Sequence, residues 1–458
     1  MRDNPERDGR PCVFDVSLDW TLPELESPVV PKGGRVDVAS EHESRTYYDT
    51  AAGDLRAVGA RLVRTDGTGA SWTLRFADLV ITVPPTGRTV PVELRELLLG
   101  IRAGAALRLD RRVDSDRTTW AVRQGECAEV GEVADVVERI AEVGDALAVT
   151  ERRRVEVSGW DGPFLKATAK WLTKAGAVAA PEPVEAAEPA DSGGTVGAAL
   201  HYFLRAQHDA ILRGDLALRR GEDAVHDTRV AIRMVRSALR IVTVVDADRT
   251  AILDAELAWM SGVLGAVRDL QVLRVHLRRS VRDLADRMPL DDSAALIERE
   301  LNEREAAARA SLAAAMASRR YFALLRTVRE WRDDPPFTAA ADEPEERLAR
   351  YVRAAEGQVE KRLKRAHDDE GLHRARKAAK RARYVATFAA TVIGNQSKTI
   401  KRAKRLQKLL GDHQDCVVAT EFLRQIAAGA QGAAAFGCGV LWVHEQELAA
   451  RARRRAVG

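Results

Sequence analysis

The sequence predicts an α+β protein with two domains, a mixed α/β domain followed by an all-helical domain that contains an internal repeat. The first 178 residues include segments rich in β-branched and aromatic residues, as strands are. From Thr195 onward almost every segment has helical periodicity, and Ala, Leu and Arg dominate. Within that part, residues 226–240 return in altered form as residues 373–387. A chain of 458 residues is long enough for two or three domains.

The first domain, residues 1–178, has two clear strand candidates, SWTLRFADLVITV (71–83) and TERRRVEVSG (150–159). The segments VPVELRELLLGI (90–101) and VGEVADVVERIAEV (130–143) are expected to form short helices or helix–strand pairs. Residues 179–194, AAPEPVEAAEPADSGG, are acidic, contain three prolines and lack aromatic residues. This composition predicts a solvated linker and therefore a domain boundary.

The second domain, residues 195–458, is expected to consist of two bundles of about four helices each, related by an approximate two-fold axis. Helix ends are predicted at residues 213–215, 246–249, 288–292 and 333–345. The last break is the strongest, and it separates a first repeat (195–332) from a second (345–458). A groove between the two bundles could bring equivalent side chains of the repeats together.

Charge is distributed unevenly along a chain whose net charge is only +4. Residues 371–408 contain twelve Lys and Arg but no Asp or Glu, and such a block attracts polyanions. The four cysteines are scattered without a CxxC pair, so neither a zinc site nor a disulfide framework is expected. The N-terminus MRDNPERDGR lacks the features of a signal peptide, and no apolar run approaches the ~20 residues of a membrane span. These features predict a cytoplasmic protein.

Both copies of the repeat begin with a histidine that is followed by basic residues at +3, +7 and +10, a spacing that places side chains on one face of a helix. Arg suits anion binding because its planar fork contacts two phosphate oxygens at once. The alternative is a solvated charged face, or Arg paired with acids on neighbouring helices. The fixed offset, the leading histidines and the lack of acids in the second copy favour anion binding. The predicted binding residues are His226, Arg229, Arg233, Arg236, Arg240, His373, Arg376, Lys377, Lys380, Arg383, Lys401, Arg402, Arg405 and Lys408.

A second pair of segments keeps almost the same offset, LGAVRDLQVL from Leu264 and LGDHQDCVVA from Leu410. Asp269 and Asp415 occupy equivalent places and are interpreted as structural acids that orient basic residues. The first repeat has an acidic segment, DRTAILDAELAWM, where the second has its extra basic stripe, so the second repeat is expected to supply more contacts. The two histidines are expected to contact phosphate, the alternative being packing residues fixed by hydrogen bonds.

The segments VHDTRVAIRMVRSALR, VRDLQVL, LHRARKAAKRARY and LQKLLGDHQD follow, in order and spacing, the pattern of a CHAD domain, the conserved histidine α-helical domain. Residues 195–458 therefore resemble that family. The resemblance implies a pair of pseudo-symmetric helical bundles that bind inorganic polyphosphate in a basic groove.

The first domain resembles a CYTH domain through TYYDTAAGDLRAVGARLVRTDG (46–67) and WTLRF (72–76), which implies an antiparallel β tunnel with flanking helices. That family opens with E-x-E-x-K, whose carboxylates bind a divalent metal and whose Lys meets phosphate. Here Asp15, Ser17 and Asp19 stand in those places, and Arg154 replaces a carboxylate in the late E-x-E strand, leaving Glu156. The tunnel is thus expected to be degenerate, with no catalytic residue, metal or cofactor.

The leading hypothesis is a polyphosphate-binding protein located in the cytoplasm or at polyphosphate granules. One alternative is a metal-dependent triphosphatase to which the CHAD domain recruits polymer. Nucleic-acid binding is the other alternative, although no aromatic ladder interleaves the basic stripes and no known nucleic-acid motif is present. The sequence does not specify protein partners.

Overall fold

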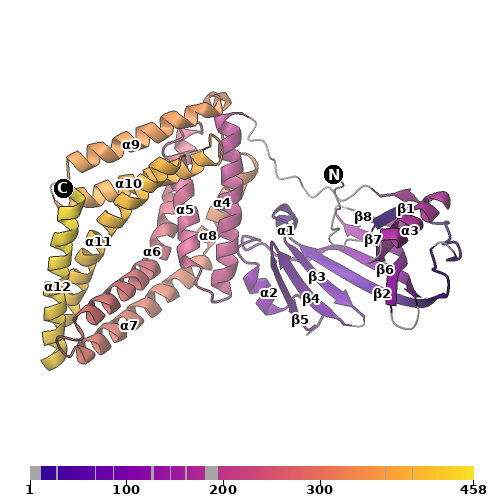
Figure 1. Ribbon diagram of the computed structural model, residues 1–458, viewed down its shortest axis with the longest axis horizontal. Coiled ribbons are helices and arrows are strands. Elements are labelled where there is room, and N and C mark those ends of the chain that lie inside the picture. Colours follow the sequence, from indigo (N-terminus) through magenta and orange to yellow (C-terminus); the bar gives the residue numbers. More distant parts are fainter. Residues whose placement is uncertain are drawn as a thin grey trace. The chain divides into compact units, whose positions relative to one another are not determined.

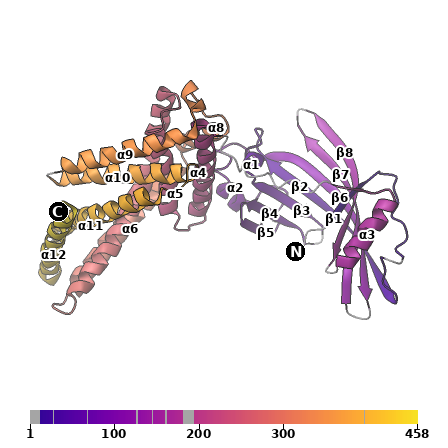
Figure 2. The same cartoon turned by 45° about the horizontal axis from the view of Figure 1, so that its top comes forward.

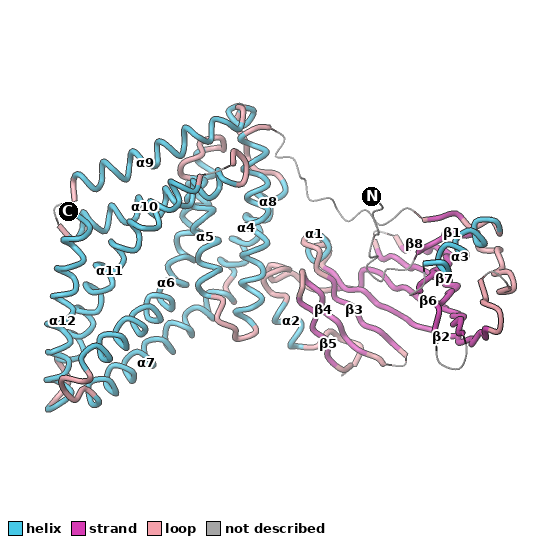
Figure 3. Tube along the Cα trace, viewed as in Figure 1, coloured by secondary structure: helices cyan, strands magenta, loops and turns pink. Residues whose placement is uncertain are grey.

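The computed structural model describes residues 12–26, 29–67, 69–85, 87–124, 128–144, 146–159, 162–180, 194–366, 368–394 and 396–457 (Figure 1). The chain divides into two compact units, residues 1–96 with 105–188 and residues 97–104 with 189–458. Most of the predicted linker, residues 181–193, lies outside the described residues. The prediction of an antiparallel β unit with helices and a helical unit is confirmed (Figure 3).

The first unit is built on a nine-stranded antiparallel sheet in the order β5-β4-β3-β2-β6-β7-β8-β1-β9. Its helix α3 packs against β1, β7 and β8. The strands are β1 (Cys12–Val16), β2 (Gly34–Asp49), β3 (Arg61–Asp66), β4 (Ser71–Phe76), β5 (Leu79–Val83), β6 (Arg108–Gln124), β7 (Ala128–Val143), β8 (Leu147–Gly159) and β9 (Val178–Ala179), and the helices are α1 (Asp54–Ala57), α2 (Val92–Leu97) and α3 (Gly162–Lys174).

Segment 130–143 is part of strand β7, so the expectation of a helix there was wrong. The segment pairs with β6 on one side and β8 on the other, and both ladders are long. Val133 is fully buried in the core that the sheet forms with Phe164 and Leu172 of α3. Gly131 allows Phe164 to approach the sheet, because a Cβ at Gly131 would lie 2.3 Å from the ring. Pairing on both sides and burial on one face outweigh the local helix-like pattern.

The second unit is helical, and equivalent helices of the two repeats pack against each other (Figures 1 and 2). α5 contacts α10, α6 contacts α11 and α7 contacts α12. The helices are α4 (Val196–Arg219), α5 (Val225–Leu239), α6 (Ala247–Leu284), α7 (Asp291–Met316), α8 (Arg319–Asp333), α9 (Leu348–Lys364), α10 (Asp369–Ala390), α11 (Ser397–Ala427) and α12 (Gly432–Val457), with short 3₁₀ turns η1 (Ala339–Asp342) and η2 (Glu345–Arg347).

The two repeats pack on each other through a shared core. Leu277 of α6, Leu301 of α7, Leu423 of α11 and Leu441 of α12 belong to one buried cluster. Burying each such side chain contributes about 1.5–3 kcal/mol, so this cluster ties the repeats together. α6 is also the one helix in the described part of the chain with the length and composition of a membrane span. Because α6 supplies this shared core, its apolar character has an explanation within the fold.

The predicted helix end at residues 213–215 is wrong, because α4 continues to Arg219. Gly214 lies against α5, where an added Cβ would be 2.0 Å from the Thr228 hydroxyl oxygen. Asp215 is buried and accepts hydrogen bonds from Arg219 at 2.9 Å and from the Tyr321 hydroxyl at 3.0 Å. The Gly-Asp pair therefore serves helix packing inside α4 and does not end the helix.

Candidate functional site

A cavity of about 520 Å³ lies among α5, α6, α10 and α11 of the helical unit. Seven Lys and Arg side chains and two histidines line it, against two carboxylates. Its charged and polar lining residues are His226, Arg229, Arg233, Arg268, Asp269, His373, Arg376, Lys377, Lys380, Arg383, Tyr384, Gln407, Gln414 and Asp415. Such an excess of cations in a concave site concentrates anions.

The predicted binding residues fall into three groups in the structure. Eight line the cavity: His226, Arg229, Arg233, His373, Arg376, Lys377, Lys380 and Arg383. Arg236 and Arg240 line an adjoining hollow of about 390 Å³ together with Arg381. The outer α11 row, defined as Lys401, Arg402, Arg405 and Lys408, is exposed and lines neither space. Within that row, Arg402 forms an ion pair with Glu360 at 3.1 Å.

The repeat builds the same Arg–Gly–Asp arrangement twice in the cavity wall. Arg229 of α5 lies over Gly265 of α6, where a Cβ would be 2.9 Å from the guanidinium, and it pairs with Asp269 at 3.1 Å. Arg376 of α10 lies over Gly411 of α11 and pairs with Asp415 at 3.9 Å. The glycines provide room for the guanidinium groups, and the acids hold them.

This arrangement agrees with Asp269 and Asp415 being orienting acids. It corrects the expectation that the second copy has no acids to pair with, since Asp415 and Glu360 both reach its basic residues.

Several donors in the cavity wall are not used within the protein. The Nε atoms of the equivalent Arg229 and Arg376 and the amide nitrogen of Gln407 are buried without a hydrogen-bond partner in the described part of the chain. A buried donor without a partner costs about 1–3 kcal/mol, so these groups would be stabilised by an acceptor that reaches them.

The centre of the cavity holds cations in close proximity. The pKa of Lys380 falls from 10.5 to about 7, chiefly because the ammonium group is buried. The positive charges of Arg376, Arg233 and Arg229 lower it further, and Asp269 opposes them slightly. Burial also lowers the pKa of Arg233, and Arg229, Arg376 and Arg236 add to this effect against an opposing effect of Tyr384. Within the described residues, neither side chain forms an ion pair. Such crowding is relieved by a bound anion.

The two repeats contribute differently to the positive charge of the cavity. In the first repeat, Asp254 of α6 binds Arg236 at 3.0 Å and Arg240 at 2.5 Å, and these bonds lower the pKa of Asp254 despite its burial. In the second repeat, Lys380 and Arg383 have no carboxylate partner among the described residues. More of the positive charge on α10 is therefore left without a carboxylate and can bind an anion.

The sequence-based reasoning missed Arg268, Gln407 and Gln414. Arg268 and Gln414 precede Asp269 and Asp415 in the repeated segment, and that equivalence is the signal that could have found them. Gln414 Oε1 lies 2.7 Å from His373 Nδ1, which assigns the proton of that bond to Nδ1. The ring of His373 is thus fixed by a hydrogen bond and also lines the cavity.

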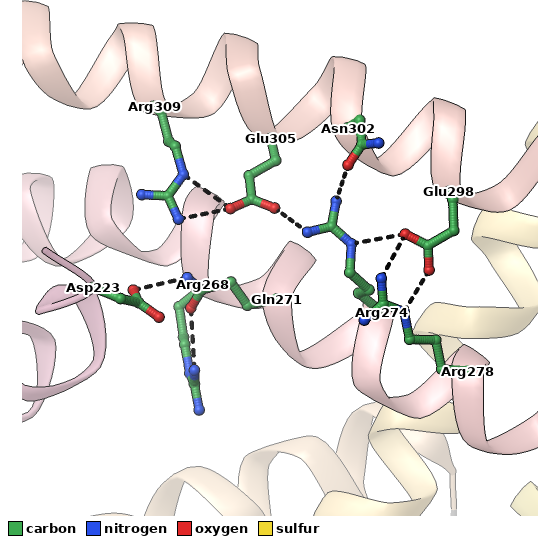
Figure 4. Close-up of polar contacts among 9 residues, drawn as sticks. All are labelled: Asp223, Arg268, Gln271, Arg274, Arg278, Glu298, Asn302, Glu305 and Arg309. Atoms are coloured by element: carbon green, nitrogen blue, oxygen red, sulfur yellow. Dashed lines mark hydrogen bonds and ion pairs between the residues drawn. The ribbon is translucent and has the colours of Figure 1, made fainter. Parts of the chain in front are cut away.

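A polar network fixes α7 to α6 on one side of the cavity (Figure 4). Glu305 accepts from Arg274 at 2.5 Å and from Arg309 at 2.9 Å, while Glu298 accepts from Arg278 at 2.6 Å. Arg268 instead donates to the Gln271 amide oxygen at 3.1 Å. A hollow of about 650 Å³ here shares Arg268, Val272 and Asp415 with the cavity. The network neutralises most of its arginines but leaves Arg268 without a carboxylate among these residues.

Asp135, Glu138, Glu151 and Glu156 on β7 and β8 of the first unit are paired with arginines. Glu156 accepts from Arg117 at 2.6 Å and lies 2.8 Å from Arg154. Asp135 binds Arg153 through both oxygens, at 3.0 and 2.6 Å. Carboxylates held in this way present guanidinium groups where a metal-dependent tunnel needs free oxygen ligands.

The chain is similar to known proteins over part of its helical unit and over nearly its full length. The family model described as the CHAD domain matches residues 203–424. Proteins described as uncharacterised from two strains of Mycobacterium tuberculosis are 29% identical over 496 aligned residues, which cover 96% of this chain and 93% of each relative.

Among solved structures, PptA from Streptomyces chartreusis aligns with a TM-score of 0.51 at 23% identity, covering 57% of this chain and 98% of that one. The CHAD domain from the plant Ricinus communis aligns with a TM-score of 0.45 at 24% identity, covering 58% and 90%. The family model identifies a CHAD domain within the helical unit, at residues 203–424. The CYTH-like tunnel in the first unit stays a prediction from the sequence.

Proposed function

We propose that this protein binds inorganic polyphosphate and that the α5–α6–α10–α11 cavity holds a run of its phosphate groups. The observation that carries the proposal is the cavity wall itself, in which seven cations and the unused donors of Arg229, Arg376 and Gln407 converge. Arg and Lys bind phosphate oxygens through charge-assisted hydrogen bonds. Polyphosphate carries charge along a thin chain without bases, so it needs no stacking platform.

The spaces around the cavity suit a polymer better than a single phosphate. The hollow lined by Arg236 and Arg240 shares Arg233, Lys377 and Lys380 with the cavity. The hollow of about 650 Å³ shares Arg268, Val272 and Asp415 with the cavity. A chain could therefore pass through the cavity and leave at both ends. With this function we also propose a cytoplasmic location, at polyphosphate granules where these form.

Calorimetric titration with polyphosphate of defined length at two salt concentrations tests the proposal. Affinity should fall steeply with salt, because each phosphate contact displaces counterions. The matched comparison is Arg233→Ala, in the cavity, against Arg405→Ala, in the outer α11 row. The proposal requires a loss of about tenfold or more for Arg233→Ala, as one charged hydrogen bond contributes about 1.5–3 kcal/mol, and little change for Arg405→Ala. Equal losses from the two variants would contradict it.

Competition separates polyphosphate from nucleic acid. Polyphosphate should displace single-stranded DNA or RNA of equal charge from the full-length protein, and neither nucleic acid should displace polyphosphate at equal phosphate concentration. The reverse order would assign the cavity to nucleic acid.

Hydrolysis by the first unit is not part of this proposal, because the carboxylates of Glu156 and Asp135 are bound to arginines. The full-length protein is expected to release no phosphate from tripolyphosphate with Mg²⁺ or Mn²⁺. Metal-dependent release that disappears in Glu156→Ala would establish the triphosphatase alternative.

A further inference from the structure

A second cluster of ligating side chains lies where α6, α11 and α12 meet. His276, Cys416 and Glu445 each offer one donor atom, and these atoms all lie within 4.8 Å of one another. The side chain of Glu445 is 0% exposed and that of His276 is 19% exposed, while Cys416 is buried. In the part of the chain that the structure describes, no other set of three or more His, Cys, Asp or Glu side chains is spaced to hold an ion.

The cluster is organised around the buried carboxylate of Glu445. His276 Nε2 lies 2.7 Å from one of its oxygens, and the Ser280 hydroxyl donates to the other at 2.5 Å. Burying a carboxylate in a helical core requires partners that replace its hydration, and His276 and Ser280 supply two of them.

We propose that His276, Cys416 and Glu445 form a binding site for a divalent transition-metal ion of the zinc type. Nitrogen, sulfur and oxygen donors in this combination match zinc, whose protein sites use His, Cys and Glu. Donor atoms around a tetrahedral zinc are roughly 3.3–3.8 Å apart, so small side-chain movements convert the present spacing into a coordination shell. Ser280 would remain as the hydrogen-bond partner that orients Glu445.

Of the three donors only His276 lines the hollow of about 650 Å³, while Cys416 and Glu445 are buried, so a fourth, exchangeable ligand would have to enter past the imidazole. Three protein ligands with an open fourth position are typical of zinc sites that exchange a ligand. This site lies outside the anion cavity and goes beyond the proposed function.

An ion bound here would cross-link the two repeats by coordination. His276 belongs to the first repeat, whereas Cys416 and Glu445 belong to the second. The donors lie beside the shared core that contains Leu277, Phe422 and Leu441. Because the site is assembled only by folding, binding must raise the stability of the folded protein.

Cobalt(II) titration of the chelator-treated full-length protein tests the proposal, because a cobalt–thiolate bond absorbs in the near ultraviolet. We expect the band to saturate at one ion per chain, with release of protons from the ligands. The matched control is Cys438→Ser, since Cys438 is also buried on α12 but is not part of the cluster. The band should persist in Cys438→Ser and vanish in Cys416→Ser. Absence of the band in the wild-type protein, or its persistence in Cys416→Ser, would overturn the proposal.

A second readout covers the case in which Cys416→Ser does not fold. Zinc should raise the melting temperature of the wild-type protein and of Cys438→Ser, and it should leave His276→Gln unchanged. An equal rise in His276→Gln would place the ion elsewhere and refute the site. No rise in the wild-type protein would show that the cluster is a metal-free polar network.

Discussion

Polyphosphate binding should weaken as pH rises through the pKa of Lys380, which is about 7 in the free protein. Below that pKa the lysine is already charged, whereas above it the protein must take up a proton to bind the polymer. With a free pKa of about 7, the charged fraction is roughly 0.9 at pH 6 and 0.1 at pH 8, so affinity should fall about tenfold from this residue alone. Terminal phosphate groups also titrate near pH 6, and a variant is needed to separate the two effects.

Lys380→Arg is that variant, because Arg keeps its charge across this range. Calorimetry at pH 6 and pH 8 in buffers of different ionisation enthalpy measures both affinity and proton uptake. The wild-type protein should take up about 0.9 of a proton more than Lys380→Arg at pH 8. Identical pH dependence and identical proton uptake in the two proteins would refute the reasoning.

The same lowered pKa has a consequence for the stability of the free protein. Because the folded state disfavours the charged lysine, the penalty is fully present below pH 7 and disappears as pH rises toward 10.5. At pH 7 it amounts to about 4 kcal/mol at most, since water and counterions in the open cavity reduce it. Lys380→Met should therefore raise the melting temperature of the free protein while lowering its affinity for polyphosphate. A lower melting temperature would contradict the assignment of strain to this charge.

Three further predictions follow from the contacts of individual side chains. Replacing Arg376, Lys380 and Arg383 by Ala should weaken polyphosphate binding more than replacing Arg229, Arg233 and Arg236 by Ala. The reason is that Asp269 and Asp254 already neutralise Arg229 and Arg236. Equal losses of affinity in the titration would contradict this asymmetry. Replacing Lys401, Arg405 and Lys408 by Ala should change affinity much less than either, and a large loss would extend the site to the outer α11 row. Glu305→Ala should lower the free energy of unfolding by about 1–3 kcal/mol, because Arg274 loses its shortest carboxylate contact but keeps Glu298 and Asn302. Glu298→Ala, which removes a more exposed carboxylate from Arg274 and Arg278, is its control, with a loss of about 1 kcal/mol or less in denaturant unfolding.

The repeated pattern was sufficient to predict which helix faces converge. Spacings of three and four fix a face on each helix, and eight of the predicted side chains meet in one cavity because α5 packs against α10. The outer α11 row obeys the same spacing but does not line the cavity. On α11 the lining consists of Gln407, Gln414, Asp415 and Val418, and Lys408 stands seven residues before Asp415 on nearly the same face. Neither charge density nor helical phase therefore excludes Lys408, and only the packed structure does.

Other features could not be predicted because they depend on tertiary packing. Residues 130–143 have apolar spacing compatible with a helix, and only pairing with β6 and β8 makes them a strand. Gly214 looks like a helix end until Thr228 is placed against it. The cluster of His276, Cys416 and Glu445 joins residues 169 positions apart, with no motif that links them in the sequence.

A crystal structure of the full-length protein with a short polyphosphate tests the central claim most directly. The claim predicts phosphate density in the cavity, within hydrogen-bond distance of Arg233 and Lys380. Density confined to the outer α11 row or to the first unit, with the cavity filled only by water, would contradict it.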